Sequence, residues 1–283
     1  MPFQNVITLS KHNRRMILIL LSCHLLWGCA LVVFWAIGQP IRTTSSWWTG
    51  GFVALQLYAA AQLLLPALLI QQEKRTRGFY LFWFSVMILS LWLINQLTVI
   101  GASRLLLSGI KSGLLLLIGT LVGTVLARFV NRIWEIIPIC IVMALADLFS
   151  WLAGPTANFA QEIEQYYLAP VGPPPLIDMF LVKLAFPGTT SLIPVFGVSD
   201  WIMVAFFVNV SRRYAINDNL IRLSGEVLAQ GKFHGRYLPV PVVALFTTVL
   251  LAQSTGLFIP VLPLIAIIML LWYAVHYLRP RRP

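Results

Sequence analysis

The sequence predicts an all-α, polytopic membrane protein with about eight transmembrane helices. Of its 283 residues, 59% are hydrophobic and only 10% are charged, whereas a soluble domain carries about 25% charged residues. Several apolar runs approach or exceed the roughly 20 residues that a helix needs to cross a bilayer. The expected spans are residues 16–38, 50–71, 79–100, 105–127, 133–153, 194–211, 238–257 and 260–278.

The first span follows the basic residues Lys11, Arg14 and Arg15, as the apolar part of a secretory signal peptide would. Its run from Met16 to about Gly38 is longer than that part of a signal peptide, and no A-x-A cleavage site follows it. We therefore predict a transmembrane helix here rather than a cleaved leader.

In the fourth span, Lys111 interrupts the apolar run near one end, and the small residues Gly119, Gly123 and Ala127 recur at every fourth position. Small residues at this spacing let two helix backbones approach closely in a membrane. We expect this face of the helix to pack against another helix.

Lysine and arginine are distributed unevenly between the two sides of the membrane. With the spans threaded in order, sixteen of the twenty lie on the side that holds both chain ends, and four lie on the other side. Basic residues are enriched in cytoplasmic loops. Both termini are therefore expected in the cytoplasm, and the proline-rich loop 154–193 is expected outside.

The same cytoplasmic loops account for the net charge of +11, so we expect the lipid bilayer as a partner and no nucleic acid. Cys23, His24 and Cys29 are too poorly aligned on a helix to form a metal cluster, and we expect neither a metal nor a cofactor. The short form and the absence of targeting signals favour a multi-pass protein of a prokaryotic cytoplasmic membrane.

Of the nine acidic residues, only Asp147 and Asp200 lie within apolar spans. An aspartate in hydrocarbon costs roughly 2.5–3.5 kcal/mol, so either a structural polar contact compensates for it or the charge serves a function. The fifth and sixth spans are consecutive and antiparallel, which places both carboxylates at a similar depth towards the outer face. No basic residue is expected at that depth, and the two aspartates therefore fit a pair that shares one proton.

Such a pair supports two kinds of chemistry. Two neighbouring carboxylates in a low dielectric cannot both ionise, so the pair holds one proton near neutral pH. The ionised carboxylate can take a proton from water while the protonated one donates a hydrogen bond to a carbonyl, as in aspartic proteases. A proton-coupled carrier could use the same pair as a proton relay.

Three segments around these aspartates resemble motifs of the presenilin and signal peptide peptidase family of GxGD-type intramembrane aspartyl proteases. "ADLFSWLAGPT" (146–156) is similar to the family's YD motif, "FGVSD" (196–200) to its GxGD motif, and "FIPVLPL" (258–264) to its PAL motif. A fourth segment, "LVKLAFPG" (181–188), is similar to the stretch that precedes GxGD in signal peptide peptidases. The motifs occur in the family's order, and the likeness covers about residues 135–278.

The resemblance implies a presenilin-like bundle, which we divide into a four-helix scaffold at residues 1–132 and a catalytic half at residues 133–283. It implies that Asp147 and Asp200 are catalytic and that the substrates are transmembrane helices of other proteins. The residues that it implies in substrate binding are Gly197, Ser199, Pro260, Val261, Leu262, Lys183, Leu184, Ala185, Phe186 and Pro187.

The chain departs from the family pattern at three motif positions. Ala146 replaces the tyrosine of YD, Ser199 replaces the second glycine of GxGD, and Val261 replaces the alanine of PAL. The family has nine spans, whereas eight are predicted here, and a missing N-terminal helix accounts for the difference. The chain is therefore interpreted as a divergent short form. A catalytically inactive homologue stays open as an alternative, together with the carrier.

A second alignment would take "YLPVP" (237–241) for the PAL motif. It would leave no span between that motif and the GxGD helix, because residues 212–237 are polar. The family has one helix at that place, so we prefer "IPVLP" (259–263), which leaves the span 238–257 between the two motifs.

Within the loop 154–193, "MFLVKLAF" (179–186) is interpreted as a strand or as an interfacial segment, and a short helical piece is expected from Glu162 and Glu164. A helical substrate must be unwound before its peptide bond can be attacked. The edge of a strand beside the aspartates could hold the unwound stretch by main-chain hydrogen bonds.

Overall fold

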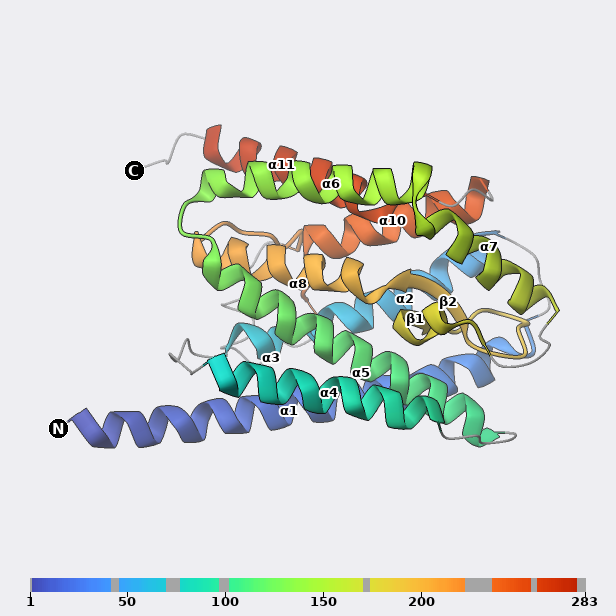
Figure 1. Ribbon diagram of the computed structural model, residues 1–283, viewed down its shortest axis with the longest axis horizontal. Coiled ribbons are helices and arrows are strands. Elements are labelled where there is room, and N and C mark those ends of the chain that lie inside the picture. The colour runs from blue at the N-terminus through green and yellow to red at the C-terminus, as the bar shows by residue number, and fades with distance from the viewer. Residues whose placement is uncertain are drawn as a thin grey trace.

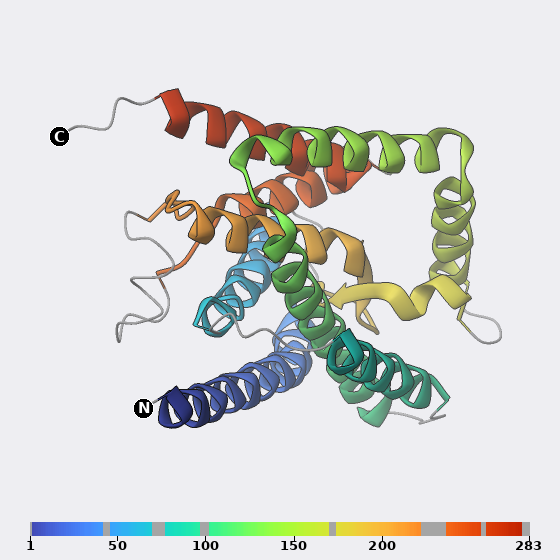
Figure 2. The same ribbon diagram turned by 60° about the vertical axis from the view of Figure 1, so that its left-hand side comes forward.

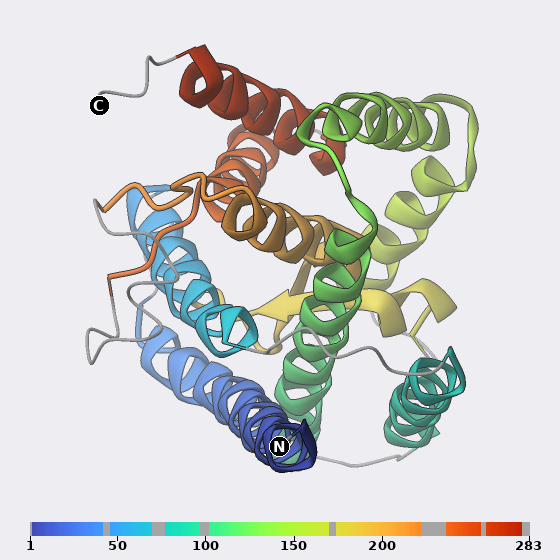
Figure 3. The same ribbon diagram turned by 90° about the vertical axis from the view of Figure 1, so that its left-hand side faces the viewer.

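The computed structural model describes residues 2–41, 46–69, 77–96, 102–169, 174–221, 236–255 and 259–278. Helices dominate these residues, as the composition predicts, and one two-stranded antiparallel sheet accompanies them (Figure 1). The first and the last helix lie on opposite sides of the molecule (Figure 3).

The helices are α1 (Pro2–Gly38), α2 (Ser46–Gln62), α3 (Leu65–Leu68), α4 (Arg77–Gln96), α5 (Ala102–Leu126), α6 (Ile136–Ala153), α7 (Pro155–Leu168), α8 (Val198–Arg213), α10 (Val240–Thr255) and α11 (Val261–Leu278). The strands are β1 (Leu181–Leu184) and β2 (Ile193–Gly197). Short 3-10 turns occupy Ala127–Phe129, Ile133–Glu135 and Leu176–Phe180.

Among the described residues, four segments are long and apolar enough to cross a membrane: Arg15–Gly38, Trp47–Leu68, Ser103–Phe129 and Ile133–Ala153. Shorter apolar helices lie at Phe84–Gln96, Val240–Thr255 and Val261–His276. These segments coincide with seven of the expected spans, while the total of eight membrane crossings stays a prediction.

The remaining expected span, 194–211, is wrong as a continuous helix. Residues Ile193–Gly197 form strand β2, and α8 begins only after Gly197, which has an extended backbone. The carboxylate of Asp200, the third residue of α8, returns to the N–H of Gly197, and an acidic side chain in this position favours a helix start. Asp200 therefore lies in the first turn of α8, not two turns inside a helix.

Helix α5 packs closely against α8 through two of its glycines. A Cβ at Gly119 would lie 2.9 Å from Trp201 Cδ1, and a Cβ at Gly123 would lie 2.7 Å from Ala205 Cβ and 2.8 Å from Phe206 N. No side chain fits at such distances without moving the neighbouring helix. The predicted packing face of this helix is confirmed, and its partner is α8.

Nearer its N-terminus, α5 packs in the same way against α1. A Cβ at Gly28 would lie 2.6 Å from Gly109 O, and a Cβ at Gly113 would overlap His24 O. Close backbone approach of this kind increases the van der Waals contact between helices in a membrane. Helix α5 therefore holds α1 and α8 together, and it runs through the middle of the molecule (Figure 3).

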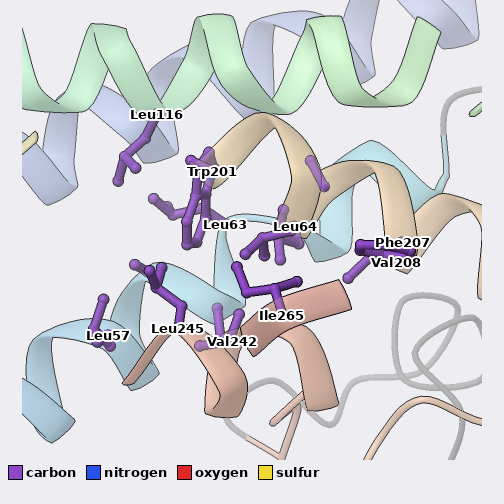
Figure 4. Close-up of a cluster of buried hydrophobic side chains, with 14 of the residues drawn as sticks. Leu57, Leu63, Leu64, Leu116, Trp201, Phe207, Val208, Val242, Leu245 and Ile265 are labelled. Atoms are coloured by element: carbon purple, nitrogen blue, oxygen red, sulfur yellow. The ribbon is translucent and has the colours of Figure 1, made fainter. Parts of the chain in front are cut away.

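The apolar core brings together residues from α2, α5, α8, α10 and α11. Figure 4 shows part of it, and the labelled side chains there that are less than 2% exposed are Leu57, Leu64, Leu116, Trp201, Phe207, Val208, Val242, Leu245 and Ile265. Because Trp201 follows Asp200 directly, the packing of this core fixes the start of α8.

Helix α6 lies along α11, and most of its surface is exposed (Figure 1). Figure 2 shows α7 descending from the end of α6 towards the two strands. This helix contains Glu162 and Glu164 and confirms the helical piece expected there. The chain between the two aspartates therefore runs from α6 through α7 and the β1–β2 hairpin to α8.

Buried hydrogen bonds join the two ends of the segment that connects α8 to α10. The hydroxyl of Tyr237 donates to Asp218 Oδ2 at 2.9 Å. Asn219 Nδ2 donates to Arg236 O at 2.9 Å, and Leu238 N–H donates to Asn219 Oδ1 at 2.9 Å. Burial raises the pKa of the Asp218 carboxyl to about 7, although its hydrogen bonds act in the opposite direction.

We expect Asp218→Asn to remove part of the pH dependence of stability. The folded carboxyl keeps its proton up to about pH 7, whereas an unfolded one loses it near pH 4. Folding therefore binds a proton between these values, so the wild type loses stability as the pH rises from about 4 to about 7 and then levels off. Thermal unfolding in detergent between pH 5 and pH 8 measures this slope. An equally steep slope in the variant contradicts the expectation.

Candidate functional site

Asp200 lies at the junction between β2 and α8 and is buried. Its Oδ2 accepts a hydrogen bond of 2.8 Å from the N–H of Gly197. The next residue, Trp201, is fully buried and stacks on Phe196 of β2, with 6.3 Å between the ring centroids. The strand before Asp200 and the helix after it therefore fix the carboxylate together.

Asp147 lies on α6, near the end that leads to α7, and is half-buried. Its Oδ2 accepts a hydrogen bond of 3.1 Å from the N–H of Leu262, in the first turn of α11. The N–H groups of a first turn have no acceptor within their own helix, and they favour a negative charge nearby. Two of the segments that resemble family motifs thus meet at this hydrogen bond. Ala146, beside Asp147, is exposed.

The charge of Asp147 contributes to the electrostatic environment of Asp200, although less than burial and the N–H of Gly197 do. Helix α11 contacts both α6 and α8, and it therefore connects the two helices that carry them. In the part of the chain that the structure describes, no lysine, arginine or histidine forms an ion pair with either aspartate. Asp147 and Asp200 thus form an acidic pair without a cation.

Both carboxylates are anchored in the same manner. Each uses its Oδ2 to accept a backbone N–H, from Gly197 in one case and from Leu262 in the other. Among the described residues, Oδ1 of each aspartate has no hydrogen-bond partner. One oxygen of each carboxylate therefore remains for a water molecule or a substrate carbonyl, which is the requirement for acid–base chemistry at the pair.

Two groups of implied substrate-binding residues lie next to the carboxylates. A Cβ at Gly197 would lie 3.1 Å from Ser199 Oγ and 3.6 Å from Asp200 Oδ2, and Ser199 is exposed. Pro260 and Val261 are half-buried and lead into the first turn of α11, beside the Asp147 anchor. Their role in substrate binding stays a prediction.

The strand expected within residues 179–186 is confirmed as β1, which pairs antiparallel with β2. The sequence does not indicate that β2 is the pairing partner of β1, because the residues of β2 continue the apolar run of α8. In the pairing, Leu181 lies opposite Gly197 and Val182 lies opposite Phe196. The end of β1 nearest the α8 junction is thus its N-terminal end.

The second edge of β1 is occupied by side chains of the helices. The N–H of Lys183 donates to Ser112 Oγ at 3.0 Å. Gln56 binds Ala185 twice, accepting from its N–H and donating to its carbonyl at 2.8 Å each. Leu184 is fully buried. At these residues, the edge of β1 that faces away from β2 is therefore not free to pair with another strand.

The segment continues with Phe186 and Pro187, which are half-buried and lie close to Gly38 at the end of α1. Of the ten implied substrate-binding residues, the five on β1 and the turn after it are thus held by the scaffold. The other five surround the two carboxylates.

A buried charged cluster anchors β1 to α5 and α7. Asp178 Oδ2 lies 2.6 Å from Lys183 Nζ and 3.8 Å from Lys111 Nζ. The hydroxyl of Tyr167 donates to Asp178 Oδ1 at 3.0 Å, and Lys111 Nζ donates to Asn95 Oδ1 at 3.2 Å. The side chain of Lys183 therefore takes part in an internal ion pair. Lys111, which interrupts the apolar run of its helix, has its partners here.

We expect Asp178→Asn to destabilise the protein strongly, because it leaves two buried lysines without their counter-charge. Removing one partner of a buried ion pair typically costs about 3–5 kcal/mol. The double variant Asp178→Asn/Lys183→Met is the control, because it removes the closer Asp178–Lys183 pair as a whole and should recover part of the loss, while Lys111 stays without its counter-charge. Thermal unfolding in detergent measures both variants. A single variant as stable as the wild type contradicts the prediction.

Within the described ranges, no group of three or more His, Cys, Asp or Glu side chains gathers as a metal site. No protein-family model, curated protein or solved structure matches the chain. A functional assignment therefore rests on the residues and the geometry of the site.

Proposed function

We propose that this protein is an intramembrane aspartyl protease that hydrolyses peptide bonds in transmembrane segments. The observation that carries the proposal is the arrangement of Asp147 and Asp200: their helices both contact α11, no described cation neutralises them, and each is anchored by a backbone N–H. The anchors come from Gly197 and Leu262, which belong to the segments that resemble GxGD and PAL. The resemblance and the geometry thus select the same residues.

The proposed reaction is a direct attack of water. The ionised carboxylate takes a proton from the water molecule while the water oxygen bonds to the scissile carbonyl carbon. The protonated carboxylate gives its proton to the carbonyl oxygen. The resulting tetrahedral diol collapses, and the C–N bond breaks as the leaving nitrogen takes a proton from the carboxylate that now holds one. One hydroxyl of the diol gives its proton to the other carboxylate, which restores the singly protonated pair. The products are a carboxylic acid and an amine, and no cofactor is required.

The substrate backbone is proposed to lie along β2. Because Ser112 and Gln56 occupy the second edge of β1, an extended substrate can extend the sheet only at the other strand. Strand β2 ends at Gly197, whose N–H contacts Asp200. A peptide paired with β2 would therefore pass directly beside the catalytic pair.

The proposal includes the membrane arrangement. The four long apolar segments, together with α4, α8, α10 and α11, make eight crossings. With the basic residues on the cytoplasmic side, both termini lie in the cytoplasm and the hairpin lies on the outer side. The resemblance to signal peptide peptidases then adds a preferred substrate orientation, with the substrate N-terminus in the cytoplasm.

Cleavage of a panel of single-span substrates by the purified protein tests the proposal. We expect the wild type to cut within the apolar segment, and a peptide isostere with a tetrahedral hydroxyl to inhibit it, because such a group mimics the diol. A substrate inserted in the reverse orientation should be cut more slowly. If no substrate in the panel is cut, the protease assignment is wrong.

The replacements at Ala146 and Ser199 keep a catalytically inactive homologue as an alternative, and the acidic pair itself would also serve a proton-coupled carrier. Substrate-dependent proton uptake into liposomes, without cleavage, would identify a carrier. Restoration of cleavage by the double variant Ala146→Tyr/Ser199→Gly would identify an inactive homologue.

A further inference from the structure

The indole of Trp201 occupies a closed slot between α5 and β2. The residue is fully buried, and its ring stacks on Phe196 with an interplanar angle of 27°. Its Nε1–H donates to Thr120 Oγ1 at 3.0 Å. Gly119 makes room for the ring, since a Cβ there would lie 2.9 Å from Trp201 Cδ1. The orientation of this indole is therefore set by one stacking contact and one hydrogen bond.

The packing of Trp201 affects the position of Asp200, because Phe196 and Trp201 lie on either side of the hydrogen-bonded residues Gly197 and Asp200 in the sequence. Between these two residues lie Gly197, which donates the anchoring N–H, and Asp200, which accepts it. A rotated indole would displace the end of β2 and the first turn of α8 together. Leaving a buried N–H without an acceptor costs about 1–3 kcal/mol, so loss of the Thr120 hydroxyl would favour such a rotation.

Thr120 is itself held in place. Its hydroxyl donates to Leu116 O at 2.8 Å, which leaves its lone pairs for the indole N–H. His24 Nε2 lies 3.4 Å from the same oxygen, and His24 Nδ1 donates to Leu20 O at 2.7 Å. Both Thr120 and His24 are fully buried. The acceptor for Trp201 is thus fixed on α5 by Leu116 and lies against His24 of α1.

We propose that Thr120 is a positioning residue for Asp200: its hydroxyl fixes the indole of Trp201 and thereby the place of the Asp200 carboxylate relative to Asp147. The inference deepens the proposed protease function and depends on it for its activity readout. Thr120 acts only through Trp201 and has no contact with the reacting atoms.

Thr124 provides a matched control one turn further along α5. Its hydroxyl donates to Thr120 O at 2.7 Å, and its Oγ1 accepts from Asn209 Nδ2 at 3.1 Å. It has the same side chain on the same helix, is also buried, and binds the same partner helix. Asn209, however, lies more than two turns of α8 away from Asp200. If the two threonines only stabilised the α5–α8 interface, replacing either one would change the activity to a similar extent.

The first experiment measures kcat and KM with a single-span substrate. We expect Thr120→Val to lower kcat by about 10- to 100-fold with KM nearly unchanged, because small displacements of a catalytic group have effects of this size. Thr120→Ser, which keeps the hydroxyl, should stay within about threefold of the wild type, as should Thr124→Val. An equal loss of kcat in Thr124→Val, or a wild-type kcat in Thr120→Val, overturns the inference.

If Thr120→Val does not fold, a variant of the hydrogen-bond donor, Trp201, provides the same test. Trp201→Phe removes the N–H instead of its acceptor and should lose kcat to the same extent. The double variant Thr120→Val/Trp201→Phe should lose no more than either single variant, because all three lack the same hydrogen bond. Additive losses overturn the inference.

A second readout does not require cleavage. The C=O stretch of protonated Asp200 is recorded by infrared difference spectroscopy as the pH is lowered, and it is assigned as the band that Asp200→Asn lacks. Thr120→Val should shift this band, and Thr124→Val should not. If the wild type cuts no substrate but the band shifts only in Thr120→Val, the proposed function is wrong and the positioning role holds. If the wild type cuts and neither kcat nor the band changes, the positioning role is wrong and the function holds.

Discussion

Replacing either aspartate, by Asp147→Asn or Asp200→Asn, is expected to lower the cleavage rate by about 10³-fold or more, because each variant removes a partner in proton transfer. The amide has nearly the volume of the carboxylate, so the protein should still fold. In the wild type, the pair must hold one proton, and activity should therefore fall at both low and high pH. Rates of cleavage of a single-span substrate across a pH range measure both effects.

Asp218→Asn is the matched control for these variants. It makes the same substitution at another buried, hydrogen-bonded carboxylate, in the segment between α8 and α10. We expect it to retain cleavage, since Asp218 belongs to neither the acidic pair nor its anchors. Full activity in Asp147→Asn or in Asp200→Asn would show that these residues are not the catalytic pair.

Gly123→Ala is expected to destabilise the protein strongly. The new Cβ would lie 2.7 Å from Ala205 Cβ and 2.8 Å from Phe206 N, so α5 and α8 must separate to admit it. Overpacking of this kind typically costs about 1–3 kcal/mol, and backbone atoms cannot move aside as a flexible side chain would. The apparent melting temperature in detergent measures the loss.

Gly51→Ala is its control. Gly51 is an exposed residue of α2, and a Cβ there would meet no atom within 4 Å. Alanine is the better helix former, by about 1 kcal/mol, so this variant should be as stable as the wild type or slightly more stable. Equal melting temperatures for Gly123→Ala and Gly51→Ala would show that the α5–α8 contact is looser than described.

The aspartates of the site can be identified from the sequence because charge is rare in apolar spans, and Asp147 and Asp200 are the acids that fall inside them. The start of α8 cannot be identified in the same way. Hydropathy runs without a break from β2 into α8, and only the hydrogen bond between Gly197 and Asp200 marks the change from strand to helix. A hydropathy window averages over this boundary.

In the fourth span, too, the sequence predicts some features of the fold and leaves others undetermined. The spacing of Gly119 and Gly123 predicts a packing face, but the identity of its partner, α8, depends on contacts between distant segments. Lys111 appears as an interruption of an apolar run, because its partner Asp178 belongs to a loop far along the chain. Period and composition are local properties, whereas the pairing of buried charges is decided by the tertiary fold.

The anchoring of the Asp147 and Asp200 carboxylates by main-chain N–H groups has a consequence for how such a site evolves. An amide N–H is present whatever side chain its residue carries, so the geometry at Gly197 and Leu262 does not depend on a particular hydroxyl, amide or cation. Neighbouring positions such as Ser199 and Val261 can then change while the two aspartates keep their donors. Proline is the one genetically encoded residue that lacks the N–H. Selection at the two anchor positions would accordingly act against proline and on backbone shape far more than on side-chain chemistry.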